Sequence, residues 1–161
     1  MECHFSYSKK IGLLVFHALL FVNLFAQSSL LTSSNLPIVV INTGGQAILD
    51  DPKITADLGI VYNGTGQRNA LTDAFNHYNG KIGIEVRGQS SQMFPMKSYG
   101  IELRLADGSS NNQSLLGMPS ESDWVLYAPY TDKTLMRNVL AYSISNSLGR
   151  YASKCRFVEL I

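Results

Sequence analysis

The residues best suited to chemistry lie in one short stretch, residues 87–99, with the sequence RGQSSQMFPMKSY. Gly88 opens it, Ser90 and Ser91 follow, and Lys97 comes near its end. Backbone N–H groups at a glycine turn can approach phosphate oxygens closely, serine hydroxyls add donors, and lysine neutralises phosphate charge. The stretch is therefore a candidate phosphate-binding loop. An ordinary surface loop is the alternative, because glycine and serine are common in loops generally.

The spacing in this loop differs from the common catalytic motifs. A P-loop requires GxxxxGK[ST] between a strand and a helix, whereas Gly88 and Lys97 lie between two predicted strands. A protein kinase also carries a glycine-rich hairpin and a strand lysine in an antiparallel sheet, but GxGxxG is absent here. The sequence GQSSQ lacks the second glycine of GxSxG, and His77 is the single histidine after residue 26, so a serine hydrolase is disfavoured.

Zinc and glycosidase chemistry are also disfavoured. After residue 26 the sequence has one cysteine, Cys155, and one histidine, too few for the usual zinc ligand set. We expect Cys155 to be a buried thiol, as most cysteines outside reactive sites are. Glu85 and Glu102 could lie on neighbouring strands as a glycosidase pair. An arginine follows each of them two residues later, and surface ion pairs explain the four residues more simply.

Two segments with a period of two flank the loop and would position it. Apolar side chains occupy every second position in residues 81–88 and again in residues 98–108. These positions are Ile82, Ile84 and Val86 in the first segment, and Tyr99, Ile101, Leu103 and Leu105 in the second. The pattern predicts two half-buried, antiparallel strands.

The rest of the domain is predicted to be further strands and one helix. Strands are expected at residues 36–43, 53–64, 123–130 and 155–161, and residues 65–80 are expected to form a loop with at most one helical turn. The predicted fold class is α+β, a mostly antiparallel sheet with one main amphipathic helix.

The predicted helix covers residues 131–149. Thr131 or Asp132 could cap its start, and Gly149 is a good stop. Apolar side chains recur at every fourth position, at Met136, Leu140, Ile144 and Leu148. Such a stripe is typical of a helix that lies on a sheet.

Residues 1–26 have the pattern of a secretory signal peptide. Two lysines precede an apolar run of 16 residues that ends at Ala26. The run is shorter than the ~20 residues of a bilayer span, so cleavage after Ala26 is favoured over an uncleaved anchor. We expect an exported protein, secreted, periplasmic or at the cell surface, without stable membrane association after cleavage. Residues 27–35 are a Ser-rich linker, and residues 36–161 form the domain.

Removal of residues 1–26 leaves a domain with no net charge. Lys+Arg falls from 13 to 11 and Asp+Glu falls from 12 to 11, so the formal charge is zero. Nucleic-acid-binding domains usually carry a basic excess, and no nucleic-acid partner is expected.

Two long stretches are similar to the spore-coat protein CotH kinase-like family. They are YNGKIGIEVRGQSSQMFPMKSYGIELR and SLLGMPSESDWVLYAPYTDKTLMRNVLAYSISNSLGRYASKCRFVEL, and the resemblance covers nearly all of residues 36–161. Residues 87–99 match the family pattern RG.SS..fPkKsY, although Met96 stands where lysine is common. Asp132, Arg137 and Asn138 match D.s.mRN.l, and helix capping with local salt bridges is an equal interpretation of these three.

The resemblance implies an atypical protein-kinase-like fold, of which this domain would be the N-terminal, nucleotide-facing part. It also implies ATP and Mg²⁺ as cofactors and phosphorylation of serine in protein substrates. Members occur as exported proteins in bacteria, including bacteria that make no spores. Lys97 would be the nucleotide-phosphate lysine, with Gly88, Ser90 and Ser91 around the phosphates.

Several parts of a working kinase are not expected in this chain. Residues 133–148 contain no acid to orient Lys97, so Asp132, Glu102 or a residue beyond 161 would have to do so. The family's catalytic and metal-binding acids lie further on, so catalytic residues remain unknown and no metal ligand is assigned. The last segment, CRFVELI, is apolar to its end, which slightly favours a truncated domain over a C-terminal strand tucked into the sheet. The alternative function is a non-catalytic exported module with a structural or surface-binding role.

Overall fold

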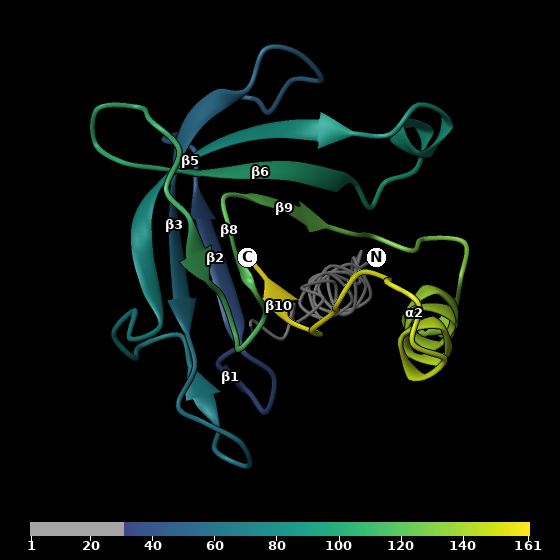
Figure 1. Ribbon diagram of the computed structural model, residues 1–161. Helices are drawn as coiled ribbons and strands as arrows, with labels where there is room; N and C mark the ends of the chain where they lie inside the picture. Colours follow the sequence, from purple (N-terminus) through teal and green to yellow (C-terminus); the bar gives the residue numbers. More distant parts are fainter. Residues whose placement is uncertain (1–30) are drawn as a thin grey trace, which may run out of the picture. The chain divides into compact units, whose positions relative to one another are not determined.

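The computed structural model describes residues 31–161 (Figure 1). The predicted signal peptide, residues 1–26, and the first part of the predicted linker lie outside the described residues. Between residues 31 and 161 there is no helix long and apolar enough to cross a membrane.

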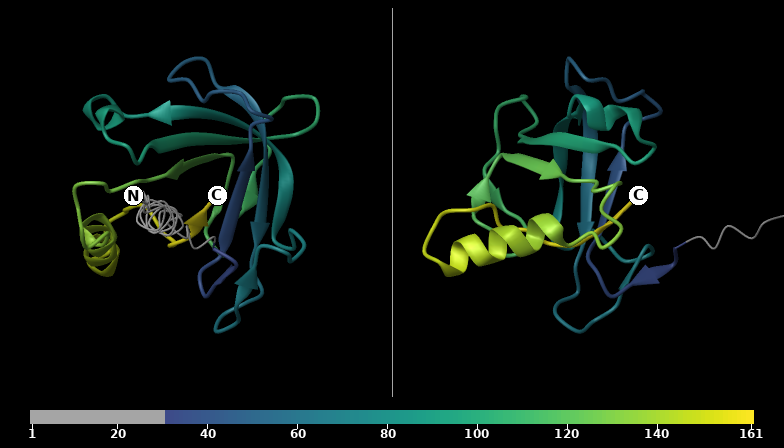
Figure 2. Two further views of the ribbon diagram at one scale, coloured as in Figure 1. Left: turned by 180° about the vertical axis from the view of Figure 1, so that it is seen from behind. Right: turned by 90° about the vertical axis from the view of Figure 1, so that its right-hand side faces the viewer.

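A six-stranded sheet forms the main part of the fold, in the order β10-β2-β3-β5-β6-β9. Its strands are β2 (Ile38–Asn42), β3 (Ile54–Val61), β5 (Tyr78–Arg87), β6 (Ser98–Arg104), β9 (Asp123–Leu126) and β10 (Glu159–Leu160). Each neighbouring pair is antiparallel except β10 and β2, which are parallel. The sheet is therefore mixed, and Figures 1 and 2 show it strongly curled. The prediction of a mostly antiparallel sheet holds, apart from the parallel pair at this edge.

Shorter elements complete the described chain. The pair β1 (Ser33–Ser34) and β4 (Asn69–Ala70) forms one two-stranded sheet, and β7 (Gln113–Ser114) with β8 (Ser120–Glu121) forms another. A 3₁₀ turn, η2 (Ser90–Met93), follows β5, and the α-helix α2 (Arg137–Ser147) precedes β10. The predicted loop at residues 65–80 thus contains one short strand and the start of another.

The core lies against the central strands and follows the predicted alternation. Ile82 on β5 is paired with Leu103 on β6, and Ile84 is paired with Ile101. All four side chains are buried, whereas Lys81 is exposed and Glu102 is only partly buried. The buried cluster also contains Val39, Ala56, Leu58, Ile60, Leu115 and Leu116. Burial of one face of the sheet explains why a period of two marked these strands.

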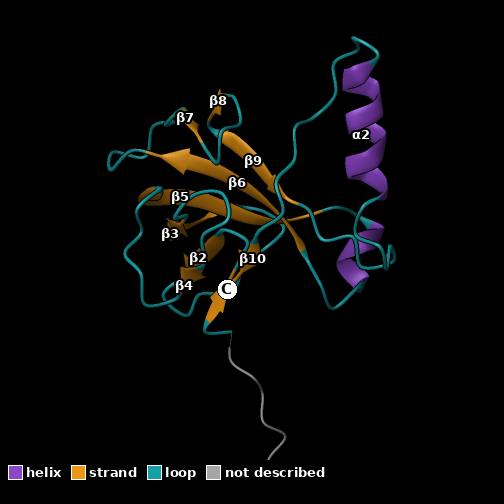
Figure 3. Cartoon of the chain, turned by 90° about the horizontal axis from the view of Figure 1, so that it is seen from below, coloured by secondary structure: helices purple, strands orange, loops and turns teal. Residues whose placement is uncertain are grey.

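The helix prediction was wrong in its start and in its packing. The chain runs without helix from residue 127 to residue 136, and α2 begins only at Arg137. No residue of α2 is buried, and Leu140 and Ile144 are 57% and 51% exposed. Figure 3 shows α2 beside the sheet, reached by an extended segment. Because that segment leads the chain away before the helix starts, the apolar stripe does not face the sheet.

The prediction of a buried Cys155 was also wrong. Cys155 is solvent-exposed, although partial desolvation raises the pKa of its thiol. The expected strand at residues 155–161 is reduced to two residues, Glu159 and Leu160, which pair with Ile38 and Val39. Cys155 lies outside the paired strand, so its side chain is not held on the buried face of the sheet.

Candidate functional site

The candidate phosphate loop connects β5 and β6. Arg87 and Ser98 are paired across these strands, so residues 88–97 form the connection. Gly88 has a φ of +101°, which favours glycine, and a Cβ at this position would collide with Oγ of Ser91. Glycine is therefore needed where the loop leaves β5.

Gln92 and Lys97 tie the loop to itself and to a neighbouring segment. The side-chain amide of Gln92 donates to the carbonyl oxygen of Gly88 and to Oδ1 of Asp50, the latter at 2.7 Å. The Lys97 ammonium donates to the main-chain carbonyl of Gln92. Lys97 is partly buried and takes part in no ion pair within the described chain. One of its three donors is used, which leaves its charge without a carboxylate partner there.

The four predicted phosphate-binding residues share this loop but differ in position. Gly88, Ser91 and Lys97 are brought together through the turn and through Gln92. Ser90 is exposed at the start of η2 and makes no side-chain hydrogen bond among residues 31–161. Sequence reasoning missed Gln92, because a polar residue inside a Gly/Ser loop gives no pattern that separates it from its neighbours.

The segment before α2 packs against the loop. The rings of Phe94 and Tyr130 are stacked with centroids 5.0 Å apart, and Nζ of Lys133 lies 4.7 Å from the Tyr130 ring centroid. The N–H of Ala128 donates to Oγ of Ser98 at 3.0 Å. The loop is thus supported by residues from two other parts of the chain, one near Asp50 and one near Tyr130.

Asp132 organises the turn that leads into α2. Its carboxylate accepts hydrogen bonds from the hydroxyl of Thr134 at 2.7 Å and from the N–H of Arg137 at 3.0 Å. The Arg137 side chain also forms an ion pair with it, at 3.5 Å. These bonds lower the pKa of the Asp132 carboxyl below its usual value. The hydrogen bond from the Thr134 hydroxyl contributes most, and the one from the Arg137 N–H comes second. Capping and a local salt bridge, one of two interpretations of Asp132 and Arg137, are therefore present, while Asn138 is exposed.

We expect Asp132→Asn to remove part of the acid sensitivity of the fold. A carboxyl whose pKa is lowered on folding contributes stability above its unfolded pKa of about 3.9, and that contribution is lost as pH falls through the folded pKa. The stability difference between wild type and Asp132→Asn should therefore shrink between pH 5 and pH 2–3. Urea unfolding across this range measures it. Glu121→Gln, at an exposed side chain, is the control, and its difference in unfolding free energy from wild type should not change with pH. If the difference for Asp132→Asn is just as constant across this range, the assignment is contradicted.

Glu102 serves a different network from the one around Lys97. Its Oε2 lies 2.7 Å from Nη2 of Arg104 and 3.8 Å from Nζ of Lys53. The hydrogen bond from Arg104 is the largest cause of a lowered pKa for Glu102. Neither Glu102 nor Asp132 forms an ion pair with Lys97, so neither takes the lysine-orienting role considered above. The expected ion pairing is confirmed for Glu102 and Arg104.

The described residues offer no metal centre. Between residues 31 and 161 no three His, Cys, Asp or Glu side chains gather in a way that could hold a metal ion. The groups that the loop presents, a glycine turn, two serine hydroxyls and the Lys97 ammonium, are of the types that suit a phosphate.

Comparison with known proteins identifies one family. Residues 84–161 match the model of the CotH kinase protein family, a range that begins in β5 and includes the whole candidate loop and α2. No curated protein and no solved structure matches the chain. This match confirms the resemblance found in the sequence over residues 84–161, which are just under half of the chain.

Proposed function

We propose that this chain carries the nucleotide-phosphate-binding part of an exported, CotH-like protein kinase. The observation that supports the proposal most directly is Lys97. Its ammonium is held at the base of a glycine-containing loop between two paired strands, without a carboxylate partner in the described chain. The loop also lies within residues 84–161, the segment that matches the CotH kinase protein model.

The loop can perform the binding step with its own groups. Gly88 turns the backbone with a positive φ and carries no side chain, so that a phosphate oxygen can approach the main chain closely. The hydroxyls of Ser90 and Ser91 add donors, and Lys97 supplies the balancing positive charge. The hydrogen bonds of Gln92 to Gly88 and Asp50 keep the loop in place before a nucleotide arrives.

Phosphoryl transfer to serine in a protein substrate belongs, in this proposal, to the complete domain. Such transfer needs a carboxylate that positions the hydroxyl nucleophile, and metal ions that neutralise the developing charge. Among residues 31–161 no three His, Cys, Asp or Glu side chains gather around a possible metal position, and the resemblance places the family's catalytic acids further along the chain. We therefore assign to this chain the binding of the ATP phosphates and not the transfer step.

Binding of MgATP to the full chain tests this function. A ligand at about 100 times its Kd stabilises the folded state by ~2.7 kcal/mol, which should raise the unfolding midpoint by roughly 5–10 °C for a domain of this size. AMP, which lacks the β- and γ-phosphates, should raise it much less. If millimolar MgATP gives no rise beyond that of Mg²⁺ alone, the alternative of a non-catalytic exported structural or surface-binding module is favoured.

A further inference from the structure

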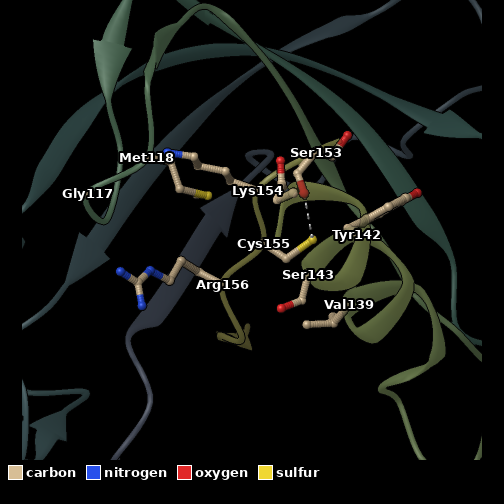
Figure 4. Close-up of a pocket in the computed structure, with 10 residues that line it drawn as sticks. Gly117, Met118, Val139, Tyr142, Ser143, Ser153, Lys154, Cys155 and Arg156 are labelled. Atoms are coloured by element: carbon tan, nitrogen blue, oxygen red, sulfur yellow. Dashed lines mark hydrogen bonds between the residues drawn. The ribbon is translucent and has the colours of Figure 1, made fainter. Parts of the chain in front are cut away.

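A second polar hollow lies away from the loop, between α2 and the segment that leads to β10. Its volume is about 330 Å³, within the range of small-ligand sites. Figure 4 shows the side chains that surround it. The lining residues are Gly117, Met118, Val139, Tyr142, Ser143, Asn146, Ser153, Lys154, Cys155 and Arg156. None of them belongs to the candidate phosphate loop.

The charge of this hollow has one sign. Lys154 and Arg156 are its only charged residues, and no acid lines it. Neither side chain takes part in an ion pair within residues 31–161. In Figure 4 both side chains extend toward the turn at Gly117 and Met118. Two unpaired cations directed to the same side of a hollow attract an anion there.

Arg156 is oriented before any ligand binds. Its Nε donates to the carbonyl oxygen of Leu116 at 3.2 Å. Leu116 has a φ of +52°, an uncommon conformation for leucine, and its N–H donates to Nε2 of His77 at 2.7 Å. The N–H of Met118 closes the turn on the carbonyl of Leu115 at 2.9 Å. Side chains from two distant segments thus hold Leu116, and the terminal guanidinium N–H groups of Arg156 make no other hydrogen bond in the described chain.

Uncharged donors complete the lining. The hydroxyls of Tyr142 and Ser143 on α2, and of Ser153, make no hydrogen bond with other described residues. The Asn146 amide is already engaged with the main chain of Ala152, at 3.2 Å for both bonds. A tetrahedral anion can accept several such bonds at once, in addition to those from a guanidinium fork and an ammonium.

We propose that this hollow is a binding site for a phosphate group, either free phosphate or a phosphate monoester, with Arg156 and Lys154 as its principal ligands. Arg156 donates from its terminal nitrogens while its Nε remains on Leu116, and Lys154 adds the second positive charge. The site is independent of the proposed nucleotide site, with which it shares no residue.

Calorimetric titration of the full chain tests the proposal. Inorganic phosphate is the probe, with chloride at matched ionic strength as the reference, and O-phosphoserine is titrated in parallel. Lys154→Gln should weaken phosphate binding at least about tenfold, as loss of a charge-assisted hydrogen bond does. Lys154 makes no hydrogen bond within residues 31–161, so this variant should fold as the wild type does. Arg150→Gln, which removes an exposed charge outside the hollow, should change the affinity less than about twofold.

The same titrations separate this site from the loop. In the Lys97→Ala background, which lacks the positive charge of the loop, Lys154→Gln should still weaken phosphate binding at least about tenfold. Tighter binding of O-phosphoserine than of phosphate would identify a monoester as the ligand, and equal or weaker binding would identify free phosphate. The proposal is overturned if phosphate binds no better than chloride, or if Lys154→Gln and Arg150→Gln have equal effects.

Discussion

Replacing Leu103 by alanine is expected to lower the free energy of unfolding by about 2–5 kcal/mol, the usual cost of removing a fully buried leucine side chain. Leu103 is 0% exposed and lies opposite Ile82 at the centre of the pairing between β5 and β6. Its N–H donates to Ser122 and its carbonyl accepts from Asn111, both at 2.8 Å, so the backbone is fixed and the space left by the side chain would not close easily. Denaturant unfolding of the full chain measures the loss.

Leu105→Ala is the matched control for that measurement. The same four-carbon side chain stands two residues later, just beyond the end of β6, and is 48% exposed. Its truncation should cost no more than about 1 kcal/mol, because much of its apolar surface already contacts water. Similar losses for the two variants would mean that the apolar face of β6 is not the one buried here.

The strands were predictable because one buried face imposes its period on the sequence. Residues 81–88 and 98–108 alternate in sequence, and Ile82, Ile84, Ile101 and Leu103 are indeed buried. Leu105 continues the sequence pattern but lies one residue beyond the end of β6. Strand pairing has ended there, so the alternation no longer predicts which side chain is buried. The parallel pairing of β10 with β2 had no such signal, since it depends on the path of the chain and not on the period of a segment.

The helix shows where periodicity stops being informative. Apolar residues at every fourth position indicate that their side chains share one face of a helix. They do not indicate whether that face packs on the sheet or is exposed to solvent. Leu140 and Ile144 share a face and are exposed, while Val139 and Tyr142 line the hollow beside Lys154. The turn at Asp132, with its bonds to Thr134 and Arg137, delays the helix to residue 137. Side-chain competition for backbone N–H groups of this kind is difficult to foresee from propensities.

The candidate loop was predictable in its composition and not in its internal bonding. Glycine, serine and lysine were recognised because each type suits phosphate binding. The link from Lys97 through Gln92 to Gly88 depends on a loop conformation that no periodic pattern encodes. The hollow at Arg156 was not foreseen for a related reason, because it joins segments about 40 residues apart through the main chain of Leu116.

Replacing Lys97 by alanine is expected to weaken MgATP binding by about 10- to 100-fold, since an unpaired ammonium in contact with phosphate contributes ~1.5–3 kcal/mol. The rise in unfolding midpoint that MgATP produces in the wild type should then largely disappear at the same concentration. Lys97→Ala also removes the hydrogen bond to the Gln92 carbonyl, so its midpoint without ATP must be measured first. The relevant quantity is the change on adding MgATP, which corrects for that loss.

Lys133→Ala is the control that distinguishes a specific phosphate contact of Lys97 from general attraction between ATP and positive charge. Lys133 is exposed and lies over the ring of Tyr130, which itself stacks on Phe94 of the loop, so it carries the same charge beside the same structure. General attraction between ATP and local positive charge would make both variants lose affinity equally. A specific phosphate contact requires a large loss for Lys97→Ala and little for Lys133→Ala. If Lys97→Ala retained the full MgATP effect, Lys97 would be a loop-bracing residue, and the nucleotide site would have to lie elsewhere.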